Sequence, residues 1–276
     1  MSVVEIKHGN RTFKYHELLF KNISELKKAN LNDWDFKLLF SGDGMTRTGK
    51  STIASQTSIV IDPSTTLDHI VFRGDKLIST SLKLGRNKVV IYDEAKEGLD
   101  SKKAMNRYSQ TITDYFSECG FLNQFLLIVL PEFFDLNKTV ALNQSICLIN
   151  CYTRNNFQRG YFNFYNRKDK RYLYIKGKKY NNYKCQKASW DGTFTDYFPF
   201  DIEEYNKRKL ENMRAGKEEK EKLGVHEKIW KTRFQLFANN LIEQNILNQR
   251  QIAKLCETDE KDISKYMIEF RESHKK

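Results

Sequence analysis

The sequence lacks any long apolar run. Its longest strongly apolar stretch, residues 125–130, has the length of a strand and is much too short for a membrane-spanning helix. The first residues, 1–7, also lack the apolar core of a secretory signal peptide. We therefore expect no membrane segment and a cytoplasmic or otherwise intracellular protein.

Cysteine and histidine patterns that would indicate structural zinc or a disulfide framework are missing as well. The five cysteines are Cys119, Cys147, Cys151, Cys185 and Cys256. They contain no paired CxxC motif, and the five histidines are scattered without ligand spacing. This pattern favours reduced thiols and gives no support for zinc chemistry.

The composition is adequate for a soluble globular protein and favours a polyanionic partner. A chain of 276 residues with 39% hydrophobic residues is long enough for one α/β core and a smaller appended domain. The formal charge of +12 favours a partner such as DNA, RNA or an acidic membrane surface, and charge alone does not distinguish these.

Residues 44–51 have the spacing of a P-loop, in which two glycines are separated by four residues and the second is followed by lysine and a hydroxyl residue. Residues 36–40 read as a buried strand before it, and residues 51–56 as the start of a helix behind it. The predicted nucleotide-binding residues are Gly44, Met45, Thr46, Arg47, Thr48, Gly49, Lys50, Ser51 and Thr52. The alternative is a glycine-rich surface loop that matches by chance.

The residue types of this loop suit phosphate chemistry. Gly44 and Gly49 let backbone N–H groups approach phosphate oxygens, and the helix N-terminus adds its positive dipole end. Lys50 is predicted to reach the β- and γ-phosphates as a catalytic residue, and Ser51 to hold Mg²⁺. ATP and Mg²⁺ are thus the expected cofactors.

A second motif follows about forty residues downstream. Residues 88–95 form a β-branched run that ends in Asp93 and Glu94, which is typical of a Walker B strand. Asp93 is predicted to bind Mg²⁺ through the outer shell of the ion, and Glu94 to polarise the attacking water as general base. The combination with the P-loop favours ATP hydrolysis.

The remaining chain up to residue 152 continues the alternation of strands and helices. Helices are predicted at 16–30, 100–120 and 136–143, and strands at 69–72, 124–130 and 145–152. Glu132, just after one strand, is a candidate sensor, and Trp34 could stack on the base or belong to the core. We assign residues 1–200 to a mostly parallel, RecA-like P-loop domain flanked by helices.

Residues 154–187 are rich in basic and aromatic residues and nearly devoid of acidic ones. Residues 160–165 and 171–177 read as two strands around a charged turn, a basic hairpin near 160–179. The predicted DNA contacts there are Lys168, Lys170, Arg171, Lys178 and Lys179. The alternative is a sheet extension whose charges are only solvated.

The C-terminal part has a different texture. Residues 201–224 alternate in charge, as in a solvated connecting helix, and 225–276 have the apolar spacing of a helix-turn-helix domain. Residues 257–260 would form the turn, with Glu257 where glycine is usual, and residues 261–271 the recognition helix carrying Lys261 and Lys265. A plain helical hairpin is the alternative.

The two motifs, the strand at 126–134 and residues 160–179 together resemble zonular occludens toxin-like and HerA/FtsK-like P-loop ATPases of viruses, plasmids and integrated elements. The resemblance implies a homo-oligomeric ring, such as a hexamer, that acts on DNA with the nucleotide between subunits. It also implies an arginine supplied by the neighbouring subunit, for which Arg107, Arg154 and Arg159 are candidates. Residues 141–145 lack the arginine expected there.

Two functions are therefore expected as alternatives. One is an oligomeric ATPase that moves, packages or unwinds DNA, that is, a translocase or helicase-type motor. The other is an ATP-switched DNA-binding regulator, or a partition or replication-initiation protein, with slow turnover. A small-molecule kinase fits poorly, because the Asp93–Glu94 pair and the basic tail do not suit it.

Overall fold

The computed structural model describes residues 2–95, 99 and 107–273. The chain divides into a larger unit, Met1–Lys209, and a smaller unit, Leu210–Lys276. The division falls inside the stretch 201–224 that was predicted as a linker. In the described part of the chain, no helix has both the length and the apolar character needed to cross a membrane.

The larger unit is built on a seven-stranded sheet with the order β4-β5-β6-β3-β7-β8-β9. The strands are β3 (Phe36–Gly42), β4 (Ile70–Val71), β5 (Val89–Tyr92), β6 (Phe125–Glu132), β7 (Cys147–Arg154), β8 (Gln158–Tyr165) and β9 (Trp190–Thr193). Strands β4, β5, β6, β3 and β7 pair in parallel, and β8 and β9 are antiparallel additions at one edge. The prediction of a mostly parallel α/β sheet is confirmed, and the arrangement is compatible with a RecA-like fold.

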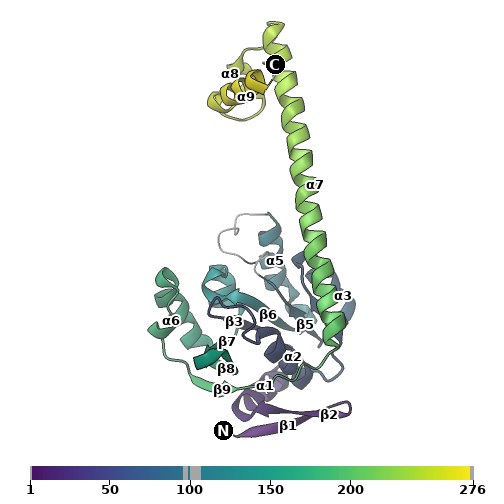
Figure 1. The fold of residues 1–276 in the computed structure, drawn as a ribbon, viewed down its shortest axis with the longest axis vertical. Coiled ribbons are helices and arrows are strands. Elements are labelled where there is room, and N and C mark those ends of the chain that lie inside the picture. The colour runs from purple at the N-terminus through teal and green to yellow at the C-terminus, as the bar shows by residue number, and fades with distance from the viewer. Residues whose placement is uncertain (1, 96–98, 100–106, 274–276) are drawn as a thin grey trace. The chain divides into compact units, whose positions relative to one another are not determined.

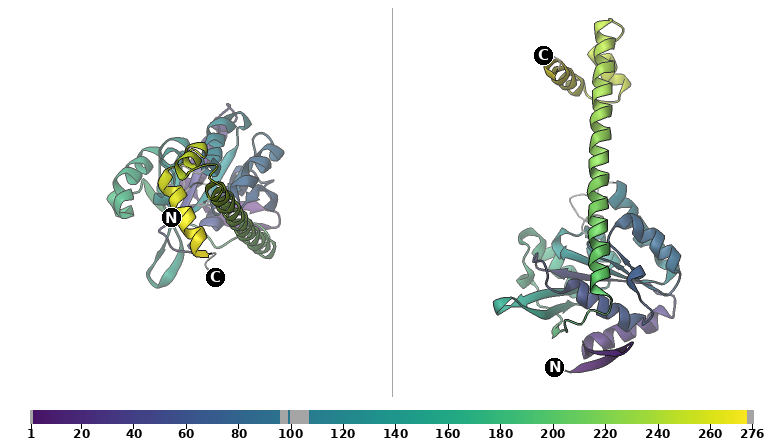
Figure 2. Two further views of the ribbon diagram at one scale, coloured as in Figure 1. Left: turned by 90° about the horizontal axis from the view of Figure 1, so that it is seen from above. Right: turned by 45° about the vertical axis from the view of Figure 1, so that its right-hand side comes forward.

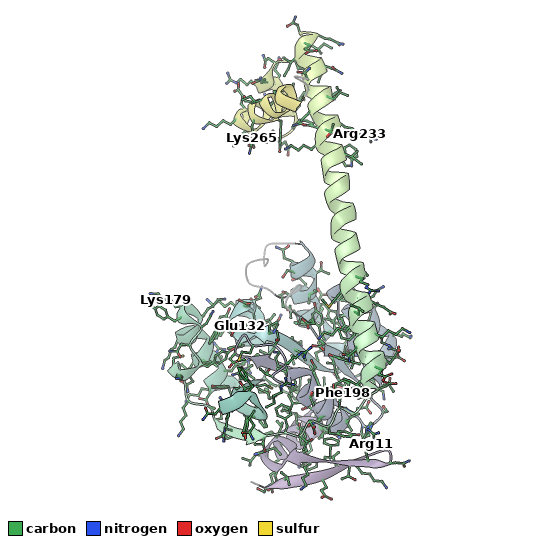
Figure 3. The ribbon with its side chains drawn as sticks, in the orientation of Figure 1. Arg11, Glu132, Lys179, Phe198, Arg233 and Lys265 are labelled. Carbon is green, nitrogen blue, oxygen red and sulfur yellow. The ribbon has the colours of Figure 1, made fainter. Side chains whose placement is uncertain are left out.

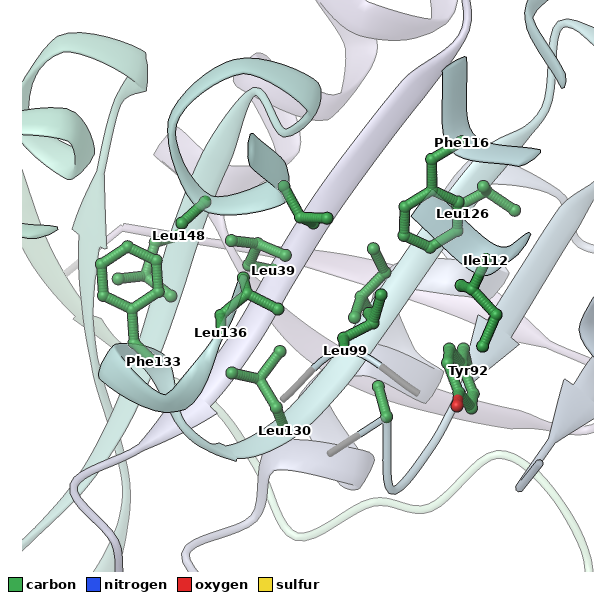
Figure 4. Packing of buried hydrophobic residues seen from close by; sticks show 14 of the residues in the cluster. Leu39, Tyr92, Leu99, Ile112, Phe116, Leu126, Leu130, Phe133, Leu136 and Leu148 are labelled. Carbon is green, nitrogen blue, oxygen red and sulfur yellow. The ribbon is translucent and has the colours of Figure 1, made fainter. Parts of the chain in front are cut away.

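Helices cover both faces of this sheet (Figures 1 and 2). They are α1 (Glu17–Asn30), α2 (Lys50–Ile61), α3 (Gly74–Leu84), α5 (Arg107–Glu118) and α6 (Arg167–Gly177). Helices α1 and α2 pack their apolar side chains against the face of the sheet that carries Leu38 and Phe40. Helices α3, α5 and α6 pack against the opposite face, which carries Leu39 (Figure 4). Burial on both faces explains why the central strands are continuous apolar runs rather than alternating ones.

The connections contain short turns of helix. They are 3-10 turns at Leu67–His69, Cys119–Leu122, Phe133–Asp135, Asn155–Phe157, Lys178–Tyr180 and Tyr183–Cys185, and a π-helical turn at Val140–Gln144. The last of these takes the place of the helix predicted over 136–143. The first part of the helix predicted over 100–120, residues 100–106, lies outside the described residues.

An N-terminal hairpin was not predicted. Strands β1 (Val3–His8) and β2 (Arg11–His16) form a two-stranded antiparallel sheet. Phe13 and Tyr15 of β2 are buried, and the Tyr15 hydroxyl lies 2.8 Å from Oγ1 of Thr57 in α2. The hairpin is thereby attached to the helix that follows the glycine-rich loop.

The predicted basic hairpin near 160–179 is wrong in its second half. Residues 158–165 form β8, but residues 167–177 form helix α6. Asn166 caps that helix, because its side chain accepts hydrogen bonds from the backbone N–H groups of Lys168 and Asp169. Side chains at helical spacing, not alternate ones, then face the core, and Leu173 and Tyr174 are both buried.

The smaller unit is helical. Helix α7 (Ile202–Glu243), whose residues 202–209 belong to the larger unit, joins the predicted linker and the next predicted helix into one, and α8 (Gln249–Leu255) and α9 (Glu260–Ser273) follow. Ala238 from α7, Ile252 from α8, and Ile263 and Met267 from α9 share a buried core. Glu257 between α8 and α9 has φ 51°, the left-handed conformation that glycine adopts most readily.

Candidate nucleotide site

The glycine-rich loop connects the end of β3 to the start of α2, as the motif requires. Gly44 and Gly49 have φ values of 83° and 93°, which L-residues rarely adopt. A Cβ atom on Gly49 would also lie 2.7 Å from Cζ of Phe194. Glycine is thus required at position 49 by conformation and by space together.

A cavity of about 670 Å³ opens beside this loop. Seven of the predicted nucleotide-binding residues, 46–52, line it together with Asp93 and Glu94. Gly44 and Met45 are not on its wall. The sheet explains the meeting of the two motifs, because the loop and the Asp93–Glu94 pair both follow the carboxyl ends of parallel strands.

Lys50, at the first position of α2, points back over the loop. Its Nζ donates to the Met45 carbonyl oxygen over 2.9 Å and lies 3.4 Å from Oγ1 of Thr48. Burial lowers the pKa of Lys50, so its positive charge is poorly solvated. Such an ammonium group gains more from an anionic partner than a fully hydrated one does.

Ser51 and Asp93 form an oxygen pair suited to a divalent cation. The Ser51 hydroxyl lies 3.3 Å from Oδ1 of Asp93, whose residue is only 2% exposed. Hydroxyl and carboxylate oxygens are the hard ligands that Mg²⁺ takes, usually beside waters and substrate phosphates. The other oxygen of Asp93 accepts a hydrogen bond from the Tyr205 hydroxyl of α7.

Glu94 has a different environment from its neighbour. Its side chain is 50% exposed, its backbone has φ 63°, and its Oε1 lies 2.7 Å from Nζ of Lys209. Burial disfavours the charged form of Lys209, but the carboxylates of Asp93 and Glu94 outweigh burial and raise its pKa. Lys209 therefore keeps its positive charge at neutral pH.

Aromatic residues of the segment after β9 form another part of the cavity wall. Phe198 and Phe200 line the cavity, with Arg11 of the N-terminal hairpin also on its wall (Figure 3). Gln56 of α2 holds this segment by donating to the carbonyl oxygens of Thr195 and Tyr197 over 2.8 and 2.7 Å. Flat apolar rings beside a phosphate loop are suited to stack on a nucleotide base.

Trp34, considered for base stacking, does not line this cavity. It is 62% exposed and precedes β3, at the end of the strand opposite to the loop. Glu132, the candidate sensor, accepts a hydrogen bond from the Tyr183 hydroxyl, which also lies 2.9 Å from the Gly42 carbonyl oxygen. Burial raises the pKa of Glu132. This carboxylate therefore lies against the beginning of the loop rather than on the cavity wall.

The three candidate finger arginines lie in different surroundings. Arg159 is exposed and lines the cavity. Arg154 stacks on Tyr161, with Cζ 4.1 Å from the ring centre, and its Nη2 lies 3.4 Å from the Tyr152 hydroxyl. Arg107 begins α5, and its side chain lies outside the described residues.

One predicted DNA contact, Lys170, is wrong because its side chain is fully buried. It lies on the inner face of α6, one turn before Leu173 and Tyr174, and its Nζ donates to the carbonyl and hydroxyl oxygens of Ser145. Burial lowers the pKa of Lys170 to about 7. The fully buried amino group of Lys170 cannot reach a DNA backbone.

The other predicted DNA contacts remain at or near the surface. Lys168, Arg171 and Lys179 are exposed, and Lys178 is half-buried beside the Tyr174 ring, 4.5 Å from its centre. In the smaller unit Lys261 and Lys265 are exposed on α9, beside a more open depression of about 850 Å³ that Asp259 and Glu260 also line. That depression has carboxylates on its wall but no glycine-rich loop.

Two contributors to the site were not predicted, Tyr205 and Lys209. Both belong to the first turns of α7, 112 or more residues after the carboxylates that they contact. The sequence signal there was only an alternating charge pattern, which does not reveal such a contact. The aromatic run around Phe198 was a visible signal, but nothing local connected it with the loop.

The fold and site define a mostly parallel α/β unit of RecA-compatible architecture, with a glycine-rich loop, a lysine, and a hydroxyl–carboxylate pair around one cavity. We compared the chain with models of protein families, with curated proteins and with solved structures, and found no match among them.

Proposed function

We propose that the larger unit binds ATP with Mg²⁺ in the cavity beside the glycine-rich loop and hydrolyses it. One observation carries this proposal: Lys50, the Ser51–Asp93 pair and Glu94 face the same cavity, although they come from two motifs. Phosphates need a cation, the metal needs oxygen ligands, and hydrolysis needs a base. Side chains on the wall of this one cavity meet all three requirements.

The roles follow from the geometry. Lys50 leaves the Met45 carbonyl oxygen and donates to the β- and γ-phosphate oxygens, and the N–H groups of the loop bind the same anion. Ser51 supplies an oxygen ligand for Mg²⁺ and Asp93 holds the ion through its outer shell, and the metal neutralises phosphate charge when it is bound. Glu94 accepts a proton from the attacking water, and its exposed carboxylate leaves room for that water.

A nucleotide-binding titration tests the ATP site. Fluorescent ATP is titrated into the wild type, into Lys50→Ala and into Lys76→Ala, which removes an exposed lysine from α3. We expect Lys50→Ala to weaken binding by about tenfold to a hundredfold, as losing a charged hydrogen bond does, and Lys76→Ala to bind normally. Unaltered binding by a folded Lys50→Ala variant contradicts the assignment.

We further propose that the ATPase acts on DNA as a homo-oligomeric ring, such as a hexamer. Support comes from the outer face of α6, where Lys168, Arg171 and the nearby Lys179 are exposed beside Tyr172 and Tyr180, which are 45% and 74% exposed. Cations for phosphates and rings for bases are the usual elements of single-strand binding. Arg159 lines the cavity of its own chain, so as our preferred finger it would act within its own subunit and not on the neighbour's nucleotide. Light scattering with and without ATP and DNA tests the assembly.

The salt dependence of DNA binding tests the α6 surface. We replace Lys168, Arg171 and Lys179 together by alanine and compare this variant with one in which three exposed lysines elsewhere, Lys7, Lys14 and Lys76, are replaced. If the α6 residues contact phosphates, the slope of log K against log salt falls by about 0.7 to 0.9 per lost contact, and the control changes it less. Equal slopes for both triple variants refute this surface.

The smaller unit contributes sequence preference in this proposal, as a helix-turn-helix with Lys261 and Lys265 on its recognition helix. Support comes from the packing of α8 against α9 and from the left-handed turn at Glu257. Deleting residues 225–276 is then expected to abolish preference among DNA sequences while ATP binding persists. Unchanged preference in the truncated protein assigns α8 and α9 to a plain helical hairpin.

A second candidate function is the ATP-switched DNA-binding regulator with slow turnover. The Lys209–Glu94 ion pair favours it, because the ammonium group of Lys209 lies 2.7 Å from Oε1 of Glu94 and occupies an oxygen that the attacking water needs as acceptor. Turnover with and without DNA separates the two functions. A motor accelerates strongly on DNA, whereas a switch binds ATP tightly and remains slow.

A further inference from the structure

Lys209 lies where helix α7 passes the carboxylates of the candidate site. Its Nζ is 2.7 Å from Oε1 of Glu94 and 3.9 Å from Oδ2 of Asp93, and the side chain is 26% exposed. Tyr205, one helical turn earlier, donates its hydroxyl to the same Asp93 oxygen. The hydrogen bond of Tyr205 thus anchors the helix one turn before Lys209, whose flexible four-carbon side chain ends at the cavity.

The two carboxylates offer Lys209 unequal interactions. Asp93 is buried and already engaged by Tyr205 and by the Ser51 hydroxyl, whereas the Glu94 side chain is half exposed. Water reaches this ion pair from the Glu94 side and screens it, which makes the Lys209–Glu94 contact exchangeable. Glu94 also has a left-handed backbone, φ 63°, which a non-glycine residue keeps only where its surroundings hold it.

We propose that Lys209 senses the terminal phosphate of ATP, exchanging its contact with Glu94 for a contact with a γ-phosphate oxygen. The inference rests on the proposed ATP site. The cavity wall contains Lys209 and the glycine-rich loop together, so an anion bound at the loop lies in the same space as this ammonium group. A terminal phosphate carries more negative charge than one carboxylate and offers several acceptor oxygens, so it competes effectively for the same donor.

The exchange has a consequence for Glu94. Once Lys209 has moved, the carboxylate of Glu94 is free to accept a hydrogen bond from water, which its role as general base requires. ADP has no terminal phosphate, so with ADP bound Lys209 stays on Glu94. Lys209 therefore distinguishes ATP from ADP and is a positioning residue for Glu94.

The test compares the affinities for a non-hydrolysable ATP analogue and for ADP at constant Mg²⁺. The proteins are the wild type, Lys209→Gln, Lys209→Arg and the control Lys207→Ala, which removes an exposed lysine two positions earlier on α7. We expect Lys209→Gln to reduce the preference for the ATP analogue by about tenfold or more through weaker binding of that analogue. Lys209→Arg keeps most of the preference, and Lys207→Ala keeps all of it.

A second readout follows the helix itself. The ATP analogue, and not ADP, is expected to change amide hydrogen exchange in residues 202–215 of the wild type, and Lys209→Gln to abolish that difference. The sensing role is overturned if Lys209→Gln weakens binding of the ATP analogue and of ADP to the same extent, or if it leaves both affinities unchanged. Either result leaves the ATP site in place. If the wild type binds neither nucleotide, the proposed function fails and the inference fails with it.

Discussion

Gly49→Ala measures how closely the segment after β9 is packed on the glycine-rich loop. An alanine Cβ at this position would lie 2.7 and 2.8 Å from Cζ and Cε2 of Phe194, where ordinary contact begins near 3.4 Å. The overlap costs about 1–3 kcal/mol, and the left-handed backbone with φ 93° costs a further 1–2 kcal/mol. We expect the free energy of unfolding to fall by about 2–5 kcal/mol in total.

The assay is urea unfolding of the full chain, followed by circular dichroism. Gly9→Ala is the matched control, because Gly9 has φ 56° and nothing within 4 Å of its Cβ position, so only the backbone cost of about 1–2 kcal/mol remains. Combining Gly49→Ala with Phe194→Ala removes the overlap and should return about 1–3 kcal/mol as coupling energy. The reasoning is refuted if Gly49→Ala costs no more than Gly9→Ala, or if the double variant shows no coupling.

Three further predictions concern single side chains. Because the pKa of Lys170 falls from 10.5 to about 7 on folding, the native state releases its proton first, and wild-type stability rises with pH between about 7 and 10. Lys170→Met removes that rise in a pH series of urea unfolding, and an unchanged pH profile contradicts the burial. Tyr205→Phe is expected to weaken Mg²⁺-dependent nucleotide binding by about fivefold, equivalent to one hydrogen bond near 1 kcal/mol, and an unaffected titration contradicts this. Ile263→Ala should destabilise the smaller unit by about 2–4 kcal/mol without altering ATP binding. If the variant loses stability and ATP binding together, the division of the chain at residue 209 is contradicted.

The sheet and the two motifs were predictable because their signals are local. Continuous apolar runs such as residues 125–130 indicated strands buried on both faces, and the glycine spacing indicated the loop before Lys50. The bounds of β3, β5 and β6 agree with those expectations within a few residues.

The prediction of a strand over residues 171–177 is wrong because the apolar residues there fit both the period of a strand and the period of a helix. Tyr172 and Tyr174 alternate as in a strand, whereas Leu173, Tyr174 and Gly177 recur as in a helix, and it is the latter set that is buried. Asn166 followed by Asp169 was the available capping signal, and giving it weight would have predicted the helix and the burial of Lys170. The N-terminal hairpin likewise carried a visible signal in Gly9-Asn10 between two alternating stretches.

The Tyr205 and Lys209 contacts were beyond prediction from local pattern. They depend on how the start of α7 packs against a strand end more than one hundred residues earlier, and α7 itself reads as an evenly charged solvated helix. No periodicity distinguishes Lys209 from Lys207, although only Lys209 lines the cavity. The helix-turn-helix and the choice of finger arginine remain predictions, because their roles depend on DNA and on a neighbouring subunit.

The central claim is that the cavity beside Lys50 is an ATPase site with Glu94 as its general base. Its most direct test measures ATP binding and single-turnover hydrolysis in the wild type and in Glu94→Gln, which keeps the size of the side chain and removes its basicity. We predict that Glu94→Gln binds Mg²⁺ and ATP at least as well as the wild type, while hydrolysis falls by about a hundredfold or more. Hydrolysis at the wild-type rate in Glu94→Gln, or parallel loss of binding and hydrolysis, contradicts it.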